Sequence, residues 1–155
     1  MCIRERCTSC ATGRSAVAGS TSCTDCWAGS FRIATTTGEE SCAICSPGNY
    51  TDASNMDACK QCPLGYAQPE NSSTFCFPCI PGTYQNQTGK ASCKQCAENE
   101  KSKDASSTKC DTCGEGEKSD LGSAKCTKCD AGEAGTPCQA CKAGMYRDAA
   151  MDADN

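Results

Sequence analysis

Residues 76–96, CFPCIPGTYQNQTGKASCKQC, contain the unit from which the rest of the chain is built. Two Cys-x-x-Cys pairs bracket a spacer that holds a glycine, a tyrosine two residues later and a second glycine. The pair recurs along all 155 residues, with successive starts 16, 19, 17, 17, 17, 17, 16 and 12 residues apart. A period of this kind predicts a tandem repeat in which each unit packs against its neighbours. The pairs begin at Cys7, Cys23, Cys42, Cys59, Cys76, Cys93, Cys110, Cys126 and Cys138.

The units have few residues with which to build a hydrophobic core. Leu, Ile, Val and Phe together contribute ten residues of 155, far below the roughly 20% that separates folded from disordered compositions. The 19 cysteines must therefore supply, by cross-linking, the stability that a core would give. No spacer has a helical apolar period. We predict a small disulfide-rich fold, mostly irregular with short β-hairpins, and an elongated rod or solenoid of about nine tandem 16–19-residue units.

Cys-x-x-Cys pairs also bind zinc, so the two chemistries have to be compared. Three N-glycosylation sequons begin at Asn49, Asn71 and Asn86, and sequons have meaning only on the secretory route. The chain has no His, which zinc modules commonly combine with Cys, and four-cysteine sites would leave three cysteines over. We therefore expect disulfides, N-linked glycans, an extracellular or cell-surface location, and no metal or cofactor.

Two disulfide patterns are compatible with the spacing. In a ladder, the second cysteine of each pair bonds the first cysteine of the next pair. In an interleaved pattern, equivalent cysteines of neighbouring pairs bond, as in Cys42–Cys59 and Cys45–Cys62. The ladder leaves only Cys141 without a partner in this chain, so that Cys141 bonds outside this segment or stays free. The interleaved pattern leaves three cysteines without a partner. The ladder is favoured, although sequence alone leaves both open. Its bonds join, two by two in this order, Cys2, Cys7, Cys10, Cys23, Cys26, Cys42, Cys45, Cys59, Cys62, Cys76, Cys79, Cys93, Cys96, Cys110, Cys113, Cys126, Cys129 and Cys138.

Alignment on the second cysteine of each pair reveals two turns in a unit. The third residue after that cysteine is Gly in eight units and Asn99 in the other, which indicates a positive φ. An aromatic residue, or a lysine whose stem could cover a disulfide, mostly stands two residues further on. We expect each unit to run through a pair, a turn, a short strand, a second turn and a second short strand. The second turn is expected at Gly19, Gly38, Asn55, Ser72, Gly89, Ser106 and Gly122.

We interpret residues 1–155 as one continuous array of cysteine-rich repeats. Residues 1–41 are the opening units, residues 42–96 are regular 17-residue units with the sequons, and residues 97–155 are charged and more divergent. No stretch approaches the roughly 18 apolar residues of a membrane span, and residues 1–30 contain no signal-peptide core. We expect the chain to be an excerpt of a longer secreted protein.

The unit Cys-x-x-Cys-x-Pro-Gly-Thr-Tyr followed by Gly-x-x-x-Cys-x-x-Cys, at residues 76–96, resembles the ephrin-receptor-like cysteine-rich repeat. Residues 42–50 and 59–66 repeat its opening. More loosely, the chain is similar to tumour-necrosis-factor-receptor and furin-like cysteine-rich modules, and to cysteine-rich surface antigens of protists. The resemblance implies an extracellular, elongated protein that is not an enzyme and serves as a stalk, coat, receptor ectodomain or fibre.

Catalysis is disfavoured because nine periodic pairs without a thioredoxin-like pattern indicate a structural role, and because the usual general base, His, is absent. No basic face is present to bind nucleic acid. Asp111, Glu115, Glu117 and Asp120 could hold a weak calcium site, but no calcium-loop motif surrounds them. The favoured function is an extracellular structural glycoprotein, a disulfide-laddered rod in a cell-surface coat, appendage or filament. Its partners would be itself or other extracellular proteins. The alternative is a receptor-like ectodomain module that binds a protein ligand.

Overall fold

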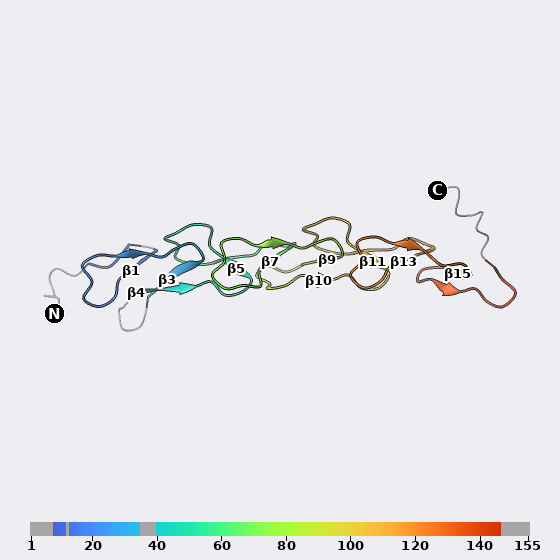
Figure 1. Cartoon of the computed structure of the whole chain (residues 1–155), viewed down its shortest axis with the longest axis horizontal. Helices are drawn as coiled ribbons and strands as arrows, with labels where there is room; N and C mark the ends of the chain where they lie inside the picture. Colours follow the sequence, from blue (N-terminus) through green and yellow to red (C-terminus); the bar gives the residue numbers. More distant parts are fainter. Residues whose placement is uncertain (1–7, 12, 35–39, 147–155) are drawn as a thin grey trace. The chain divides into compact units, whose positions relative to one another are not determined.

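The computed structural model in Figure 1 describes residues 8–11, 13–34 and 40–146. These residues contain no helix, and none therefore forms a helix able to cross a membrane. They form sixteen short strands, paired in eight two-stranded sheets. The strands are β1 (Arg14–Ser15), β2 (Thr24–Asp25), β3 (Ser30–Ala34), β4 (Glu40–Ile44), β5 (Asn49–Tyr50), β6 (Lys60–Gln61), β7 (Tyr66–Ala67), β8 (Phe77–Pro78), β9 (Thr83–Tyr84), β10 (Lys94–Gln95), β11 (Glu100–Lys101), β12 (Asp111–Thr112), β13 (Glu117–Lys118), β14 (Thr127–Lys128), β15 (Glu133–Ala134) and β16 (Gln139–Ala140).

Eight disulfides join the second cysteine of each pair to the first cysteine of the next, as in the ladder and not as in the interleaved pattern. Their Cα–Cα distances are 5.6–5.8 Å, typical of unstrained disulfides. The predicted Cys2–Cys7 bond lies outside the described residues, and Cys141 has a free thiol. We call the segment closed by each disulfide a finger. Fingers 1 to 8 are closed by Cys10–Cys23, Cys26–Cys42, Cys45–Cys59, Cys62–Cys76, Cys79–Cys93, Cys96–Cys110, Cys113–Cys126 and Cys129–Cys138.

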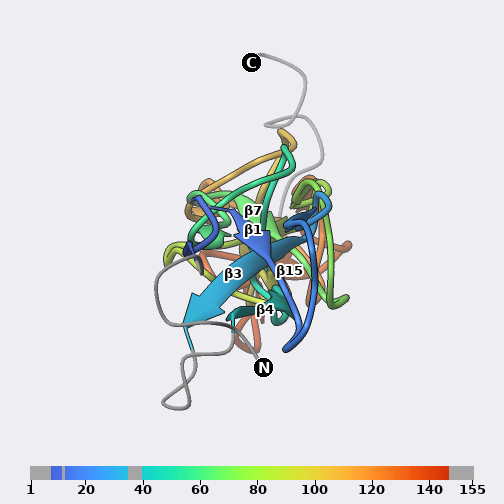
Figure 2. The same ribbon diagram turned by 90° about the vertical axis from the view of Figure 1, so that its left-hand side faces the viewer.

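Each finger carries a minimal hairpin whose second strand differs from the one expected. In finger 3, Asn49 pairs with Gln61 and Tyr50 with Lys60, so the second strand lies inside the Cys-x-x-Cys rather than before it. The reason is that the N–H of Cys62 donates to the first-turn carbonyl of Gly48 at 2.9 Å, which draws the pair itself into the hairpin. Among the described hairpins, only β3–β4 (Figure 2), with five residues in each strand, begins its second strand before the pair.

Both predicted turns have the left-handed backbone that their residue types indicated. Asn99 has φ of 63°, and the glycines aligned with it have φ between 74° and 86°. The second-turn residues are left-handed in the same way, including the non-glycines Asn55, Ser72 and Ser106 at 55–63°. Gly38 lies outside the described residues. A left-handed conformation costs little for Gly and is tolerated by Asn, which explains the composition of both positions.

The chain divides into two compact units. The first comprises the residues up to Phe77 and the segment Gln87–Ser92, and the second comprises Pro78–Asn86 and the residues from Cys93 onward. The segment Gln87–Ser92 holds the second turn of finger 5. It belongs to the first unit because the N–H of Gly89 donates to the carbonyl of Cys62, at the start of finger 4, at 2.9 Å.

In the first unit, a first-turn glycine meets the second turn of the finger two places further on. A Cβ added to Gly29 would lie 2.1 Å from the carbonyl oxygen of Ser72, and one added to Gly48 would lie 2.1 Å from that of Gly89. The second unit repeats this contact, with 2.0 Å from Gly82 to the carbonyl oxygen of Gly122. Side chains never approach backbone so closely, so these positions require Gly for space as well as for φ.

Asn99 occupies the first turn of finger 6, where a side chain is accommodated. By the same rule, finger 6 would meet the second turn of finger 8. Finger 8 is shortened to a disulfide separation of nine residues, and its left-handed residue, Gly135, lies inside the tight loop of the β15–β16 hairpin rather than four residues before the next pair. The first turn of finger 6 therefore needs a left-handed residue but not an absent side chain, and Asn satisfies that need.

Substitution of Gly29 tests this close approach against a matched control. Gly19 and Gly29 have φ of 85° and 86°, but a Cβ on Gly19 would have nothing within 4 Å. We expect Gly19→Ala to destabilise the protein by about 1–3 kcal/mol through backbone strain alone. Gly29→Ala should cost more, or lead to mispaired disulfides, because fingers 2 and 4 cannot both keep their places.

Thermal unfolding of the oxidised proteins, together with disulfide mapping by mass spectrometry, measures the difference. Equal losses from Gly19→Ala and Gly29→Ala would contradict a packing role for the missing side chain.

Candidate functional site

The interior of the fingers is made of sulfur and neutral polar groups. Among the described residues, the buried apolar side chains are Ala67 and eight cysteines, and each of these is the second cysteine of its pair. The first cysteines of the described pairs, from Cys23 to Cys138, are half-buried instead. No Leu, Ile, Val, Phe or Trp side chain in the described part of the chain is buried. The disulfides therefore stand where a soluble domain normally places its aliphatic core.

A buried polar residue, which the sequence analysis missed, lies near the buried cysteine in the sequence of several fingers. It is the sixth residue after the second cysteine, and we call it the hub residue. Its exposed fraction ranges from 0% to 8% in five consecutive fingers. The signal was present in the alignment, since this position holds Thr, Gln or Ser in these five fingers, but polar residues in a spacer are usually solvated. The hub residues are Thr51, Gln68, Gln85, Ser102 and Ser119.

Within each unit, hub residues join one finger to its neighbours on either side. In the first unit, the carbonyl of Gln68 accepts from Gly48 N–H of finger 3 at 2.7 Å, and its N–H donates to Lys90 of finger 5 at 3.2 Å. In the second unit, the carbonyl of Ser102 accepts from Gly82 at 2.8 Å, and its N–H donates to Ser123 at 3.3 Å. This backbone pairing explains their burial, because buried peptide groups must be hydrogen-bonded.

The side chain of Gln68 closes its own loop. Its Nε2 donates to the carbonyl of Phe75 at 2.7 Å, and its Oε1 accepts from the N–H of Glu70 at 3.0 Å. The side chain is 1% exposed, so both ends of the amide are satisfied inside the protein. This arrangement fixes residues 70–75, which include the sequon at Asn71.

The predicted glycosylation residues occupy three different environments. Asn49 is half-buried, and its Nδ2 donates to the carbonyl of Pro47 at 3.2 Å and to the hydroxyl of Ser46 at 3.3 Å. The hydroxyl of its sequon belongs to the buried hub residue Thr51, where it accepts from Gly29 N–H at 2.6 Å. The fold itself therefore requires this hydroxyl, whether or not a glycan is added.

Asn71 and Asn86 are both exposed. The Oδ1 of Asn86 accepts from Lys94 Nζ at 3.0 Å, which leaves its Nδ2 as the group that would carry a sugar. The hydroxyl of Thr88 donates to Gln61 Oε1 at 3.0 Å. Exposed asparagines on loops are the positions at which a folded chain accommodates a bulky glycan. Of the three sequons, these two have the geometry suited to modification.

The large apolar side chains lie largely on the surface. Trp27 is 59% exposed, Phe75 53% and Phe77 47%. The rings of Phe75 and Phe77 contact each other edge to face, with centroids 4.8 Å apart and planes at 75°. Phe31, in β3, is half-buried. The Phe75–Phe77 pair is thus an apolar surface that remains in contact with solvent.

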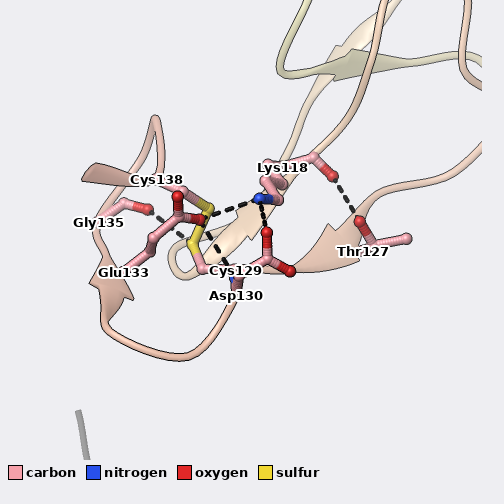
Figure 3. Close-up of polar contacts among 7 residues, drawn as sticks. All are labelled: Lys118, Thr127, Cys129, Asp130, Glu133, Gly135 and Cys138. Atoms are coloured by element: carbon pink, nitrogen blue, oxygen red, sulfur yellow. Dashed lines mark hydrogen bonds and ion pairs between the residues drawn. A yellow bond between two sulfur atoms is a disulfide. The ribbon is translucent and has the colours of Figure 1, made fainter. Parts of the chain in front are cut away.

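Lys118 holds the position at which other fingers carry an aromatic residue, but its role differs from the one expected. Its Nζ forms ion pairs with Asp130 and, at 3.0 Å, with Glu133 (Figure 3). Glu133 also accepts from the N–H of Asp130 at 3.2 Å. The hydrogen bond to Asp130, and then that to Glu133, raise the pKa of Lys118. Its charged end, rather than only its aliphatic stem, joins finger 7 to the shortened finger 8.

The Cys-x-x-Cys pairs do not form dithiol couples. In the pairs from Cys23/Cys26 to Cys126/Cys129, the first cysteine closes one finger and the second cysteine closes the next. Exchange catalysts instead oxidise and reduce the two cysteines of one pair. The described residues also contain no group of three or more His, Cys, Asp or Glu side chains that could hold a metal ion. The acidic residues considered for calcium are accordingly not assembled into a site, and Glu117 accepts from Gly114 N–H at 3.1 Å instead.

Comparison with known proteins found no match among protein families and none among curated proteins.

Substitution of Gln68 tests the hub position. We expect Gln68→Glu to be strongly destabilising at neutral pH, because the new carboxylate would be buried and could not donate to the carbonyl of Phe75. Burial would raise the pKa of the new carboxyl group, so the loss should shrink as pH falls and the protonated form regains a donor. Unfolding measured from pH 7 to pH 4, relative to the unsubstituted protein, gives the result.

Gln61→Glu is the matched control, since Gln61 is exposed and should tolerate the charge. Similar losses from both substitutions, or a Gln68→Glu loss that does not change with pH, would contradict the assignment of Gln68.

Removal of the Lys118 ammonium tests the link between fingers 7 and 8. Lys118→Met keeps the aliphatic stem, and we expect faster amide hydrogen exchange in residues 130–134, while fingers 2 and 3 are unchanged. Because the pKa of Lys118 is raised in the folded protein, the attraction is complete below the ordinary lysine value of 10.5 and is lost as pH rises through the raised value.

Salt should accelerate the same exchange in the unsubstituted protein by screening the ion pairs, and should have little effect on Lys118→Met. Lys125→Met, in the same finger but outside this network, is the control. An equal response to salt in all three proteins would contradict the link.

Proposed function

We propose that the protein is an extracellular structural glycoprotein, a disulfide-laddered rod that forms part of a cell-surface coat, appendage or filament. The observation that carries the proposal is the regular repetition of the same links within each unit. One disulfide closes every finger, hub backbone groups join neighbouring fingers, and first-turn glycines contact the second finger onward. Repeats that contact only near neighbours extend in one dimension.

The chemistry of the interior supports an oxidising, extracellular setting. Nearly all the cohesion that a core would supply is assigned to disulfides, which persist outside the cytosol and are reduced inside it. In the chain-entropy model a disulfide with a loop of about 15 residues stabilises by roughly 3 kcal/mol. In an array with a bond of this kind in every finger, each finger is stabilised against unfolding by its own disulfide. This property suits a mechanical or protective role.

The receptor-like alternative is favoured by one feature, the exposed aromatic side chains of Trp27, Phe75 and Phe77. Aromatic residues are the commonest anchors of protein interfaces. A ligand-binding module would use them to bind a partner, whereas a structural rod would use them for contacts between copies or under glycans.

Secretion from a glycosylating host, followed by intact mass and free-thiol measurement, tests the proposal first. We expect one free thiol or a thiol-linked dimer, hexose-bearing mass, and a radius of gyration in solution scattering well above the roughly 15 Å of a globular chain of this length. Most thiols free, with zinc released on denaturation, would overturn it.

Analytical ultracentrifugation over a range of concentrations then separates the two functions. Assembly of the pure protein, abolished in the double variant Phe75→Ser/Phe77→Ser, supports the structural role. A protein that stays monomeric at all concentrations, with saturable binding to intact cell surfaces that the same variant abolishes, supports the receptor-like role instead.

A further inference from the structure

The loop that carries Asn71 is held in one conformation from three sides. Inside the loop, the Gln68 amide binds Glu70 N–H and the Phe75 carbonyl. Outside it, the N–H of the left-handed Ser72 donates to the carbonyl of Cys45 at 2.8 Å. The hydroxyl of Ser73 donates back to the carbonyl of Glu70 at 3.3 Å. Asn71 itself is exposed, so a rigid turn presents it to solvent.

The same loop brings the backbone next to Asn71 close to the backbone of Phe75. Because both Gln68 hydrogen bonds end on one amide group, Glu70 N and Phe75 O lie within about 8 Å of each other. Asn71 follows Glu70 directly, and the Phe75 ring is in edge-to-face contact with Phe77. An attachment point and a half-exposed apolar surface therefore lie at the two ends of one closed loop.

We propose that an N-linked glycan on Asn71 packs its first sugar, an N-acetylglucosamine, over Phe75 and Phe77. A pyranose ring has one face lined with C–H groups, which fits against an aromatic ring, while its hydroxyl rim stays in water. Covering the two rings would remove apolar surface from solvent. This inference rests on the proposed function, because it needs a glycoprotein.

The other sequons do not have this arrangement. The amide nitrogen of Asn49 is directed to its own turn, at Ser46 and Pro47. Asn86 is exposed like Asn71, but its amide contacts Lys94, whose ammonium lies 5.8 Å from the centroid of the Tyr84 ring. Asn86 therefore provides a matched control, an exposed sequon beside a ring that a cation already covers.

The experiment uses the secreted full chain, trimmed enzymatically to one N-acetylglucosamine at each occupied asparagine. Nuclear magnetic resonance would record the sugar signals in the unsubstituted protein, in Asn71→Gln, in Asn86→Gln and in Phe75→Ser/Phe77→Ser. We expect one sugar to show upfield-shifted protons and cross-relaxation to phenylalanine ring protons. Those signals should vanish in Asn71→Gln, persist in Asn86→Gln, and lose their shift in the double Phe variant.

Free-thiol counts equal to that of the unsubstituted protein verify that each variant has folded. A sugar on Asn71 without ring contacts would overturn this inference and leave the proposed function standing, and so would an Asn71 that stays unmodified while Asn86 is occupied. Absence of sugar from all three asparagines after secretion would overturn both.

Discussion

The structure depends on how closely the backbones of different fingers approach one another. The first turn of one finger and the second turn of the finger two places on meet with no room for a side chain, at 2.1 Å between a hypothetical Cβ on Gly29 and the Ser72 oxygen. Contact at this range requires glycine on one side and a left-handed backbone on the other. Once the turns are fixed, the hub residues are placed to pair with both neighbours. Gly29, Gly48 and Gly82 are therefore packing residues as much as turn residues.

This close packing leaves an interior of sulfur and amide groups. The second cysteines are buried and the hub residues between them are polar, so the usual gain from aliphatic burial is small. Covalent links compensate by restricting the unfolded chain, and the backbone pairs satisfy the peptide groups that the fingers bury. Large apolar side chains are therefore not needed in the interior. Several of them, including Trp27 and Phe75, lie on the surface, where they can serve contacts with sugars or proteins.

The regular links also account for where the array changes. Finger 8 has a disulfide separation of nine residues, against 13–16 in the others. Its short spacer moves the left-handed residue, Gly135, into the loop of the β15–β16 hairpin. Finger 6 has Asn99 rather than glycine at its first turn, and the ion pairs of Lys118 join finger 7 to finger 8. A change in one spacer thus alters residue requirements in neighbouring fingers, as expected where stability is carried by contacts between adjacent repeats.

The repeat, the preference for the ladder and both left-handed turns could be predicted from the sequence, because cysteine spacing and glycine placement are local signals that can be aligned. It did not reveal that β6, β8 and β10 lie inside the Cys-x-x-Cys pairs, nor that Gln68 is buried while Phe75 is exposed. Hydropathy predicts the opposite for those two residues. These two outcomes come from tertiary contacts, because burial here follows backbone pairing between residues 20 or more positions apart, and no periodicity within one spacer records it.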